Sequence, residues 1–180
     1  MPEIQIRPVT NSDIERLVNI EHDYVTDYVW QMDISQEEPD DIGVRFRRVR
    51  LPRSVRTEYP RPYAQLSKNW KERSGVLVAC HEKEVIGYIA LMERMAPGTT
   101  WATDLAVKNA YRRQGVGSSL VLAAQAWSSQ HGSQRLVLEM QSKNHPAICM
   151  MNKLGFDFCG YNDRYFLNRD IALFYAKSVR

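Results

Sequence analysis

The sequence has few cysteines and no long hydrophobic run. Its three cysteines, Cys80, Cys149 and Cys159, are odd in number and lack the spacing of a metal site, which disfavours a disulfide-rich secreted scaffold and a zinc centre. No segment approaches the roughly 18 consecutive apolar residues of a membrane helix, and the first residues contain no apolar signal core. We therefore expect a cytoplasmic protein that binds no metal and does not enter a membrane.

Glycine and proline are also scarce, with nine and eight residues of 180, which excludes a collagen-like chain. Hydrophobic residues make up 44% of the sequence and charged residues 25%, as in ordinary folded proteins, so the composition argues against intrinsic disorder. A chain of this length can bury one substantial core. We expect residues 1–180 to form a single domain.

The net charge is only +3, which does not by itself indicate a nucleic-acid partner. Its distribution is uneven, because no Lys or Arg lies between Arg16 and Arg45. That stretch holds eight acids: Glu21, Asp23, Asp27, Asp33, Glu37, Glu38, Asp40 and Asp41. Seven arginines follow within 17 residues: Arg45, Arg47, Arg48, Arg50, Arg53, Arg56 and Arg61. The acids would favour a cationic amine as ligand unless the arginines neutralise them, and no nucleic-acid motif accompanies the arginines.

The first third of the chain begins with a strand and a helix. Alternation of Ile4 and Ile6 up to Pro8 predicts a short strand near a sheet edge. Helix signals follow, namely N-cap candidates at Thr10 and Ser12, capping-box spacing from Ser12 to Glu15, and an apolar face of Ile14, Leu17 and Val18 that continues weakly to Tyr24 and Tyr28. Residues 33–73 break this pattern, and we expect an extended, hairpin-like insert that covers part of the domain.

The remaining segments alternate between the two periodicities. Residues 76–80, 85–92, 99–107, 136–140, 156–161 and 166–175 are apolar or β-branched runs that predict strands, the first two as an antiparallel pair. Apolar residues recur at helical spacing from Val116 to Trp127 and from Ala147 to Leu154, before Gly132 and Gly155. This order predicts an α/β fold, with a mixed sheet covered by helices.

A glycine turn between a strand and a helix is the most informative motif. It reads Arg112-Arg-Gln-Gly115-Val-Gly117-Ser-Ser119. Unpaired N–H groups at such a helix start, together with the helix dipole, bind phosphate or diphosphate. A nucleotide-triphosphate loop would need a lysine after Gly117, and a dinucleotide fingerprint would need glycine at Leu120. A plain turn is the remaining alternative.

This turn resembles the signature Gln/Arg-x-x-Gly-x-Gly/Ala of the GNAT superfamily of acyl-CoA-dependent N-acyltransferases, and it matches at every fixed position. A second motif agrees downstream, with Asn144-His-Pro-Ala147 followed by Lys153-Leu-Gly-Phe156. The similarity covers residues 74–161 well and residues 3–28 loosely, and the tail is similar to streptothricin-acetyltransferase-type members. The resemblance implies a mixed, mostly antiparallel central sheet flanked by helices, with the insert after the first helix.

The resemblance also implies acetyl-CoA as co-substrate and a primary amine of a small molecule or peptide as acceptor. The pantetheine arm would pair with the strand end at Leu105, Ala106 and Val107. The cofactor-binding turn would comprise Arg112, Arg113, Gln114, Gly115, Val116, Gly117, Ser118 and Ser119, with the diphosphate on the N–H groups of residues 113–118. Asn144 and Ala147 would also contact the cofactor, although Asn144 is equally suited to cap the helix that follows.

Amine acylation needs a group that accepts a proton, because a lysine-type amine has a pKa of about 10.4. Asp104 is the first candidate for this base and Glu139 the second, and for each the alternative is a salt-bridged strand carboxylate. An N–H near Val107 would hold the tetrahedral oxyanion. Where many members have a tyrosine that protonates the thiolate, this chain has Met151. Tyr165 is our candidate replacement, with Tyr161 and Cys149 as alternatives.

Met151 and the arginines also allow two other hypotheses. The first is a catalytically weak acyl-CoA-binding or RNA/ribosome-associated module that keeps the fold. The second is that the insert forms a homodimer interface.

Overall fold

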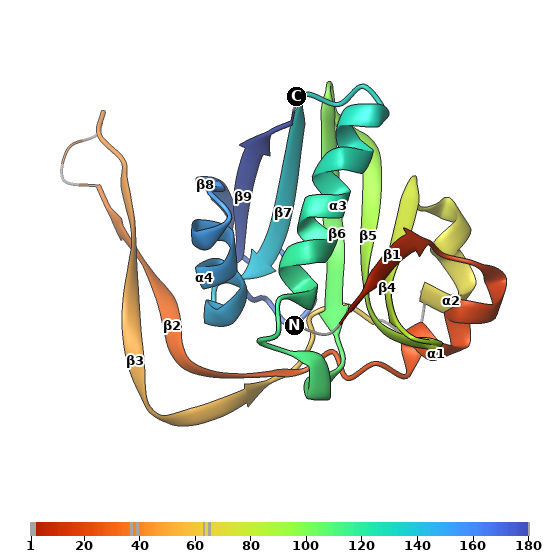
Figure 1. The fold of residues 1–180 in the computed structure, drawn as a ribbon. Helices are drawn as coiled ribbons and strands as arrows, with labels where there is room; N and C mark the ends of the chain where they lie inside the picture. The colour runs from red at the N-terminus through yellow and green to blue at the C-terminus, as the bar shows by residue number, and fades with distance from the viewer. Residues whose placement is uncertain (1–2, 37, 39, 63, 65, 180) are drawn as a thin grey trace.

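A computed structural model describes residues 3–36, 38, 40–62, 64 and 66–179. Its centre is a seven-stranded sheet with the order β1-β4-β5-β6-β7-β9-β8 (Figure 1). The strands are β1 (Gln5–Pro8), β4 (Gly75–His81), β5 (Glu84–Ala96), β6 (Thr99–Val107), β7 (Arg135–Gln141), β8 (Asp157–Asn162) and β9 (Ala172–Ser178). All neighbours are antiparallel except β6 and β7. The predicted mixed, mostly antiparallel fold is confirmed.

Helices cover both faces of this sheet. Helices α3 (Val116–Gln130) and α4 (His145–Lys153) pack on one face, and the short helices α1 (Ile14–Val18) and α2 (Leu66–Asn69) pack on the other. The structure also describes 3-10 turns at η1 (Asn11–Asp13), η3 (Trp70–Glu72) and η4 (Asn109–Tyr111). Among the described residues, no helix has the length and apolar character needed to span a membrane.

The N-terminal strand lies at the sheet edge, as Pro8 indicated. The capping box that follows it is Thr10 with Asp13, rather than Ser12 with Glu15: the Asp13 carboxylate accepts from Thr10 N at 2.8 Å. It also forms an ion pair with Arg7 at 2.7 Å, which lowers the pKa of Asp13. Because Asp13 is buried beside this cation, it fixes the helix start against β1, and Ser12 stays exposed.

The predicted helix ends at Val18, so its continuation to Tyr24 and Tyr28 was wrong. Tyr24 begins β2 (Tyr24–Ser35), which pairs with β3 (Gly43–Thr57) in a separate two-stranded sheet. The reason is a period of two, since Tyr24 and Thr26 are buried while Val25 is exposed. We call β2 and β3 the arm, and Figure 1 shows it extending away from the body. The hairpin-like insert is confirmed but starts nine residues earlier than residue 33; Glu37 and Tyr63 lie outside the described residues.

The last two strands are present, but the second of them was predicted six residues too early. β9 starts at Ala172, and residues 166–171 form a turn. Arg169 has a left-handed φ of 63°, and the Asn168 side chain accepts from Asp170 N at 3.1 Å. Such local bonds compete with strand pairing, which explains why the apolar run at Phe166 does not form a strand.

Candidate active site

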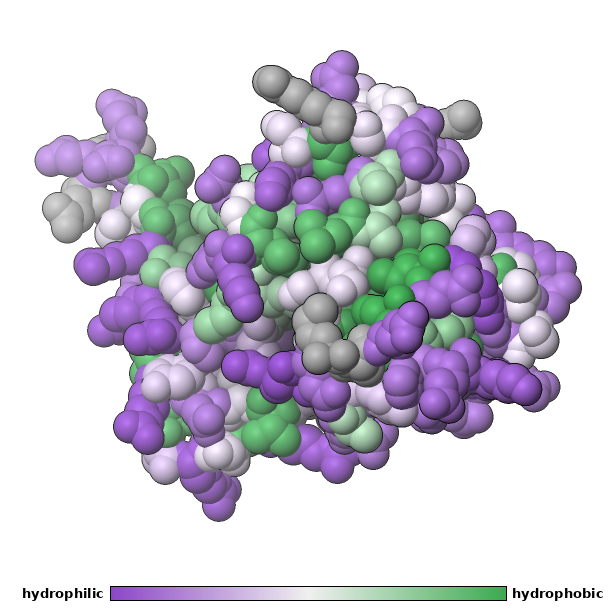
Figure 2. Space-filling view, viewed as in Figure 1, coloured by the Kyte–Doolittle hydropathy of each residue, from purple (hydrophilic) through white to green (hydrophobic). Residues whose placement is uncertain are grey.

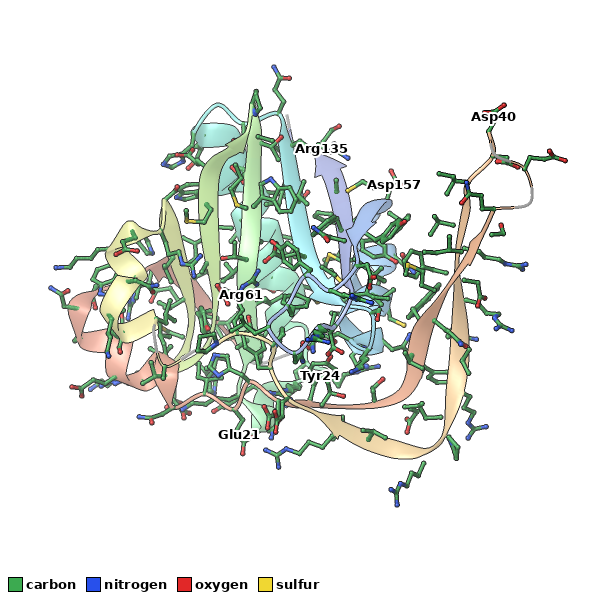
Figure 3. The ribbon with its side chains drawn as sticks, turned by 180° about the vertical axis from the view of Figure 1, so that it is seen from behind. Glu21, Tyr24, Asp40, Arg61, Arg135 and Asp157 are labelled. Atoms are coloured by element: carbon green, nitrogen blue, oxygen red, sulfur yellow. The ribbon has the colours of Figure 1, made fainter. Side chains whose placement is uncertain are left out.

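The site begins where the two parallel strands separate. β6 and β7 pair only as far as Ala102 and Leu138, while β6 stays paired with β5 up to Val107. Arg61, which follows the arm, fills the gap that opens: its Nη1 donates to Thr103 O at 2.6 Å and its Nη2 pairs with the Glu139 carboxylate. Figure 3 shows Arg61 at this position in the middle of the sheet. The guanidinium thus satisfies a carbonyl that β7 no longer reaches.

The first predicted base, Asp104, is buried on β6 and held by three side chains. Tyr59 Oη donates to Asp104 Oδ1 at 2.8 Å, and Thr103 Oγ1 donates to Oδ2 at 2.9 Å. Arg73 Nη2 lies 3.4 Å from Oδ2. The carboxylate is therefore fixed in orientation, and Tyr59, which donates to it, also lines the two cavities described below. The ion pair with Arg73 also matches the predicted alternative, in which Asp104 is a salt-bridged strand carboxylate.

The second candidate, Glu139, has a fully buried side chain on β7. Besides its ion pair with Arg61, it accepts from Tyr165 Oη at 2.8 Å. Burial raises the pKa of Glu139, and the charge of Arg61 opposes that rise. Burial and the Glu139 carboxylate raise the pKa of Tyr165 to about 12. The structure thus brings Glu139 and Tyr165 together as one hydrogen-bonded pair, next to the gap between β6 and β7.

Removing the cation from this buried pair should cost stability. We expect Arg61→Met to lower the free energy of unfolding by about 3 kcal/mol, because it leaves the Glu139 carboxylate uncompensated. The folded-state pKa of Glu139 then rises further above that of the unfolded chain, so the destabilisation grows as pH rises and is relieved in acid. Urea unfolding at about pH 7 and about pH 5 measures both effects.

The matched double variant combines Arg61→Met with Glu139→Gln and so removes the buried negative charge as well. The amide oxygen introduced at position 139 can still accept the hydrogen bond from Tyr165. The double variant should recover most of the lost stability and show no such pH dependence. If the double variant is as unstable as Arg61→Met alone, the ion pair is not what Arg61 contributes.

The glycine turn has the geometry of an anion cradle. Arg113 and Gly115 have left-handed φ values of 63° and 88°, and Ser119 N makes the first helical bond, to Gly115 O at 2.9 Å. By helix geometry, the N–H groups of the preceding residues point out of the helix end. A Cβ at Gly117 would lie 3.2 Å from Met150 Sδ, so a larger residue there would crowd the turn. The cradle fits a diphosphate.

A cleft of about 380 Å³ opens at this turn, which we call the loop cleft. It is lined by Leu105, Ala106, Val107, Arg112, Arg113, Gly115, Gly117, Ser118, Asn144 and Ala147 of the predicted site, together with His22, Tyr24, Tyr59, Pro146, Cys149, Met150 and Lys153. A smaller cavity of about 60 Å³, the strand cavity, lies between the separated strands and is lined in part by Tyr59, Arg61, Glu139, Met151 and Phe166. The two cavities adjoin, because both are lined by Tyr59, Leu105, Asn144, Ala147 and Met150.

Three predicted cofactor residues do not face the loop cleft with their side chains. Val116 is buried in the core, Gln114 Nε2 donates to Ala110 O at 2.7 Å, and Ser119 uses its N–H within the helix. Val116 and Gln114 can take part through their backbone N–H groups alone.

Two further residues also have structural roles. The Arg112 guanidinium donates to Val107 O and Asp23 O, each at 2.7 Å, and to Glu21 O, so it joins the turn to the start of the arm. Asn144 caps α4 by accepting from Ala147 N at 3.1 Å, which confirms the capping alternative. Both residues nevertheless line the loop cleft.

Several lining residues were missed in the sequence. Tyr59 and Arg61 belong to the expected insert and lie 45 and 78 residues from their partners Asp104 and Glu139. His22, which also lines the loop cleft, forms a hydrogen bond with Tyr88, with His22 Nε2 and Tyr88 Oη 2.8 Å apart. Only the unusual segment Tyr59-Pro-Arg-Pro62, with an aromatic and a cation between prolines, could have drawn attention to this part of the insert.

Two acids of the acidic run form ion pairs with arginines of the neighbouring strand, and a third accepts a hydrogen bond from a serine. Asp23 pairs with Arg56 at 3.1 Å and Asp33 with Arg47 at 3.4 Å, while Asp27 accepts from Ser54 at 2.5 Å. These three acids are therefore bound by the neighbouring strand and give no support for a cationic acceptor.

Comparison with known proteins agrees with this geometry. A model of the acetyltransferase (GNAT) family matches residues 44–156. N-alpha-acetyltransferase 30 of Schizosaccharomyces pombe is 31% identical over 118 residues, which are 63% of this chain and 76% of that protein. A nourseothricin acetyltransferase crystal structure has a TM-score of 0.84 at 20% identity, covering 98% of this chain and 99% of that chain.

A structure from Bacillus anthracis str. Ames, described as a streptothricin acetyltransferase in complex with acetyl coenzyme A, has a TM-score of 0.77 at 19% identity, covering 98% and 99% of the two chains. The family model spans more than half of the chain, which therefore belongs to the GNAT acetyltransferase family. It is an acyl-CoA N-acyltransferase that uses acetyl-CoA and acts on an amine acceptor.

Proposed function

We propose that this enzyme transfers the acetyl group to a primary amine of a small molecule or peptide by direct attack on the thioester, through a tetrahedral intermediate. The observation that carries this proposal is that the loop cleft and the strand cavity adjoin, with Tyr59 among the residues that line both. A donor held along the glycine turn would end beside the buried carboxylates. An amine entering next to Tyr59 and Asp104 would then reach the same point without a covalent enzyme intermediate.

The residues that would hold the donor are those of the loop cleft. The N–H groups of residues 113–118 and the side chains of Arg113 and Lys153 supply positive potential for its phosphates. Beyond Ala102, β6 is no longer paired with β7, and its edge from Leu105 to Val107 would accept an extended chain as an added strand. An N–H near Val107 would stabilise the oxyanion.

Proton transfer would run through Tyr59. Tyr59 lines both cavities and its hydroxyl donates to Asp104. The hydroxyl would accept a proton from the amine nitrogen, which becomes positively charged as it attacks, while it passes its own proton to the carboxylate. The reverse movement returns that proton to the departing thiolate. This pathway supplies the acid that the family tyrosine would give, since Met151 at that position is apolar and fully buried. Tyr165 is the second candidate acid, and its bond to Glu139 directs its proton away from neutral acceptors.

Release of free thiol from acetyl-CoA tests the proposal across a panel of polyamines, aminoglycosides and peptides with free N-termini. We expect turnover with at least one primary amine, and mass spectrometry should show one acetyl group on its nitrogen. Blocking that nitrogen by methylation to a tertiary amine should abolish turnover. Saturable coenzyme A binding without thiol release for any amine would instead favour the catalytically weak binding module.

A further inference from the structure

The strand cavity is small and closed at one end. Its volume of about 60 Å³ leaves room for roughly two water-sized groups. Leu105 lines both this cavity and the loop cleft, whereas Ala102 and Leu138 line only the strand cavity of the two. Ala102 and Leu138 form the last pair between β6 and β7, and each is 3% exposed. A group that enters from the loop cleft therefore stops where the two strands pair.

Helix α4 forms one wall of the strand cavity, with Ala147, Met150 and Met151. Ala147 and Met150 also line the loop cleft, and Met150 is partly exposed. Met151 does not line the loop cleft, is 0% exposed, and packs in the main core with Ala102 and Leu138. Figure 2 shows side chains of α3, α4 and the arm packed over this face of the sheet. Met151 therefore belongs to the closed end of the cavity, and the core encloses its side chain.

A second wall of the strand cavity is held in place by charge. The Glu139 side chain is fully buried and forms an ion pair with Arg61, and both residues line the cavity. Phe166, which is 5% exposed, completes this wall, and the Arg61 guanidinium lies over its ring, 5.3 Å from the centroid. Moving Arg61 away would leave a buried charge uncompensated, which is strongly unfavourable. This wall therefore does not withdraw to admit a larger group.

We propose that Met151 limits the length of the acyl group that this enzyme transfers. The inference rests on the proposed function, in which the donor lies with its diphosphate at the glycine turn and its chain along Leu105 to Val107. Its acyl end would then enter the strand cavity past Leu105. The carbonyl and methyl of an acetyl group amount to roughly two water-sized groups, whereas each further methylene needs space that the Met151 side chain occupies. An extra methylene in an apolar pocket lowers kcat/KM by about 10- to 200-fold.

Thiol release from acetyl-, propionyl- and butyryl-CoA, with an amine found in the panel above, tests this limit. We expect kcat/KM of the wild type to fall about tenfold or more for each added methylene. Met151→Ala removes Cγ, Sδ and Cε at the closed end, and a core closes such a space only in part. The ratio of kcat/KM for butyryl-CoA to that for acetyl-CoA should therefore rise at least about tenfold. Ile148→Ala is the matched control, because Ile148 is equally buried on α4 but lines neither cavity; this variant should keep the wild-type ratio.

Isothermal titration calorimetry with the same donors and no amine separates this inference from the proposed function. Each added methylene should weaken binding to the wild type and weaken binding to Met151→Ala much less. If no amine supports thiol release, the proposed function fails, and these affinities alone decide whether Met151 limits the chain. Should Met151→Ala not fold, Met151→Val keeps more of the core and should raise the ratio for propionyl-CoA instead. Equal kcat/KM for the three donors in the wild type, or equal affinities where no amine is accepted, would overturn the proposal, as would equal changes of the ratio in Met151→Ala and Ile148→Ala.

Discussion

Replacing Gly117 by glutamate is expected to abolish coenzyme A binding while the protein stays folded. The side chain would start 3.2 Å from Met150 Sδ and place a carboxylate in the anion cradle of the turn. There it would occupy the N–H groups that the diphosphate needs and repel its charge. An acid in the first turn of α3 also interacts favourably with the helix dipole, so unfolding is not the expected consequence. Affinity for coenzyme A should fall by about 100-fold or more, equivalent to about 2.7 kcal/mol.

Isothermal titration calorimetry with coenzyme A measures this loss. Gly117→Ala is the matched control, because it adds the Cβ and its contact with flexible Met150 but no charge. Its affinity should fall much less than that of Gly117→Glu. Unchanged affinity in a folded Gly117→Glu protein would show that the diphosphate does not bind at this turn.

Tyr59→Phe should lower kcat by roughly 100-fold or more, the usual contribution of positioned acid–base catalysis. The phenyl ring keeps the packing but removes the hydroxyl that touches Asp104 at 2.8 Å. Asp104→Asn should cause a similar loss and leave coenzyme A affinity nearly unchanged. Since the two groups would act as one relay, the double variant should be no slower than the slower single variant.

The pH dependence gives an independent check. Burial, followed by the Asp104 charge, raises the pKa of Tyr59 well above 10.0. The hydroxyl therefore stays protonated well into the alkaline range, and we expect no alkaline loss of kcat from Tyr59 up to about pH 10. Tyr161→Phe serves as the control, because Tyr161 packs on Phe46 away from both cavities.

Multiplicative losses of kcat in the Tyr59 and Asp104 double variant would mean that the two residues act separately.

Local sequence patterns predicted most of the central domain. The β6 strand at residues 99–107 and the α3 start at Val116 coincide with the structure, because periodicity, glycine turns and capping act over a few residues. The glycine turn was recognisable for the same reason, since its anion-binding groups are consecutive backbone N–H groups. Helix α4 also begins where Asn144 and Pro146 indicated.

The error at Tyr24 and Tyr28 arose where long-range contacts override local preference. Tyr24 and Tyr28 suited a helical face, but β2 forms there because β3, more than twenty residues later, pairs with it and because Tyr24 Oη reaches Gln141 at 2.8 Å. Nothing in the local pattern of the arm shows which of its apolar residues the body covers. That Phe46 is docked and Val44 exposed follows from where α4 and β8 end.

The sequence by itself determined the glycine turn, the half of the site that we propose binds coenzyme A, because this turn depends on a short run of backbone geometry. The tertiary structure decided the other half: it brought Tyr59 and Arg61, which follow β3 in the sequence, to the gap between β6 and β7. The gap between β6 and β7 and the bond of Arg61 to Thr103 across it exist only in the folded chain. No local sequence pattern encodes a contact between residues that far apart. The proposed acid–base half of the site therefore depends on the tertiary structure.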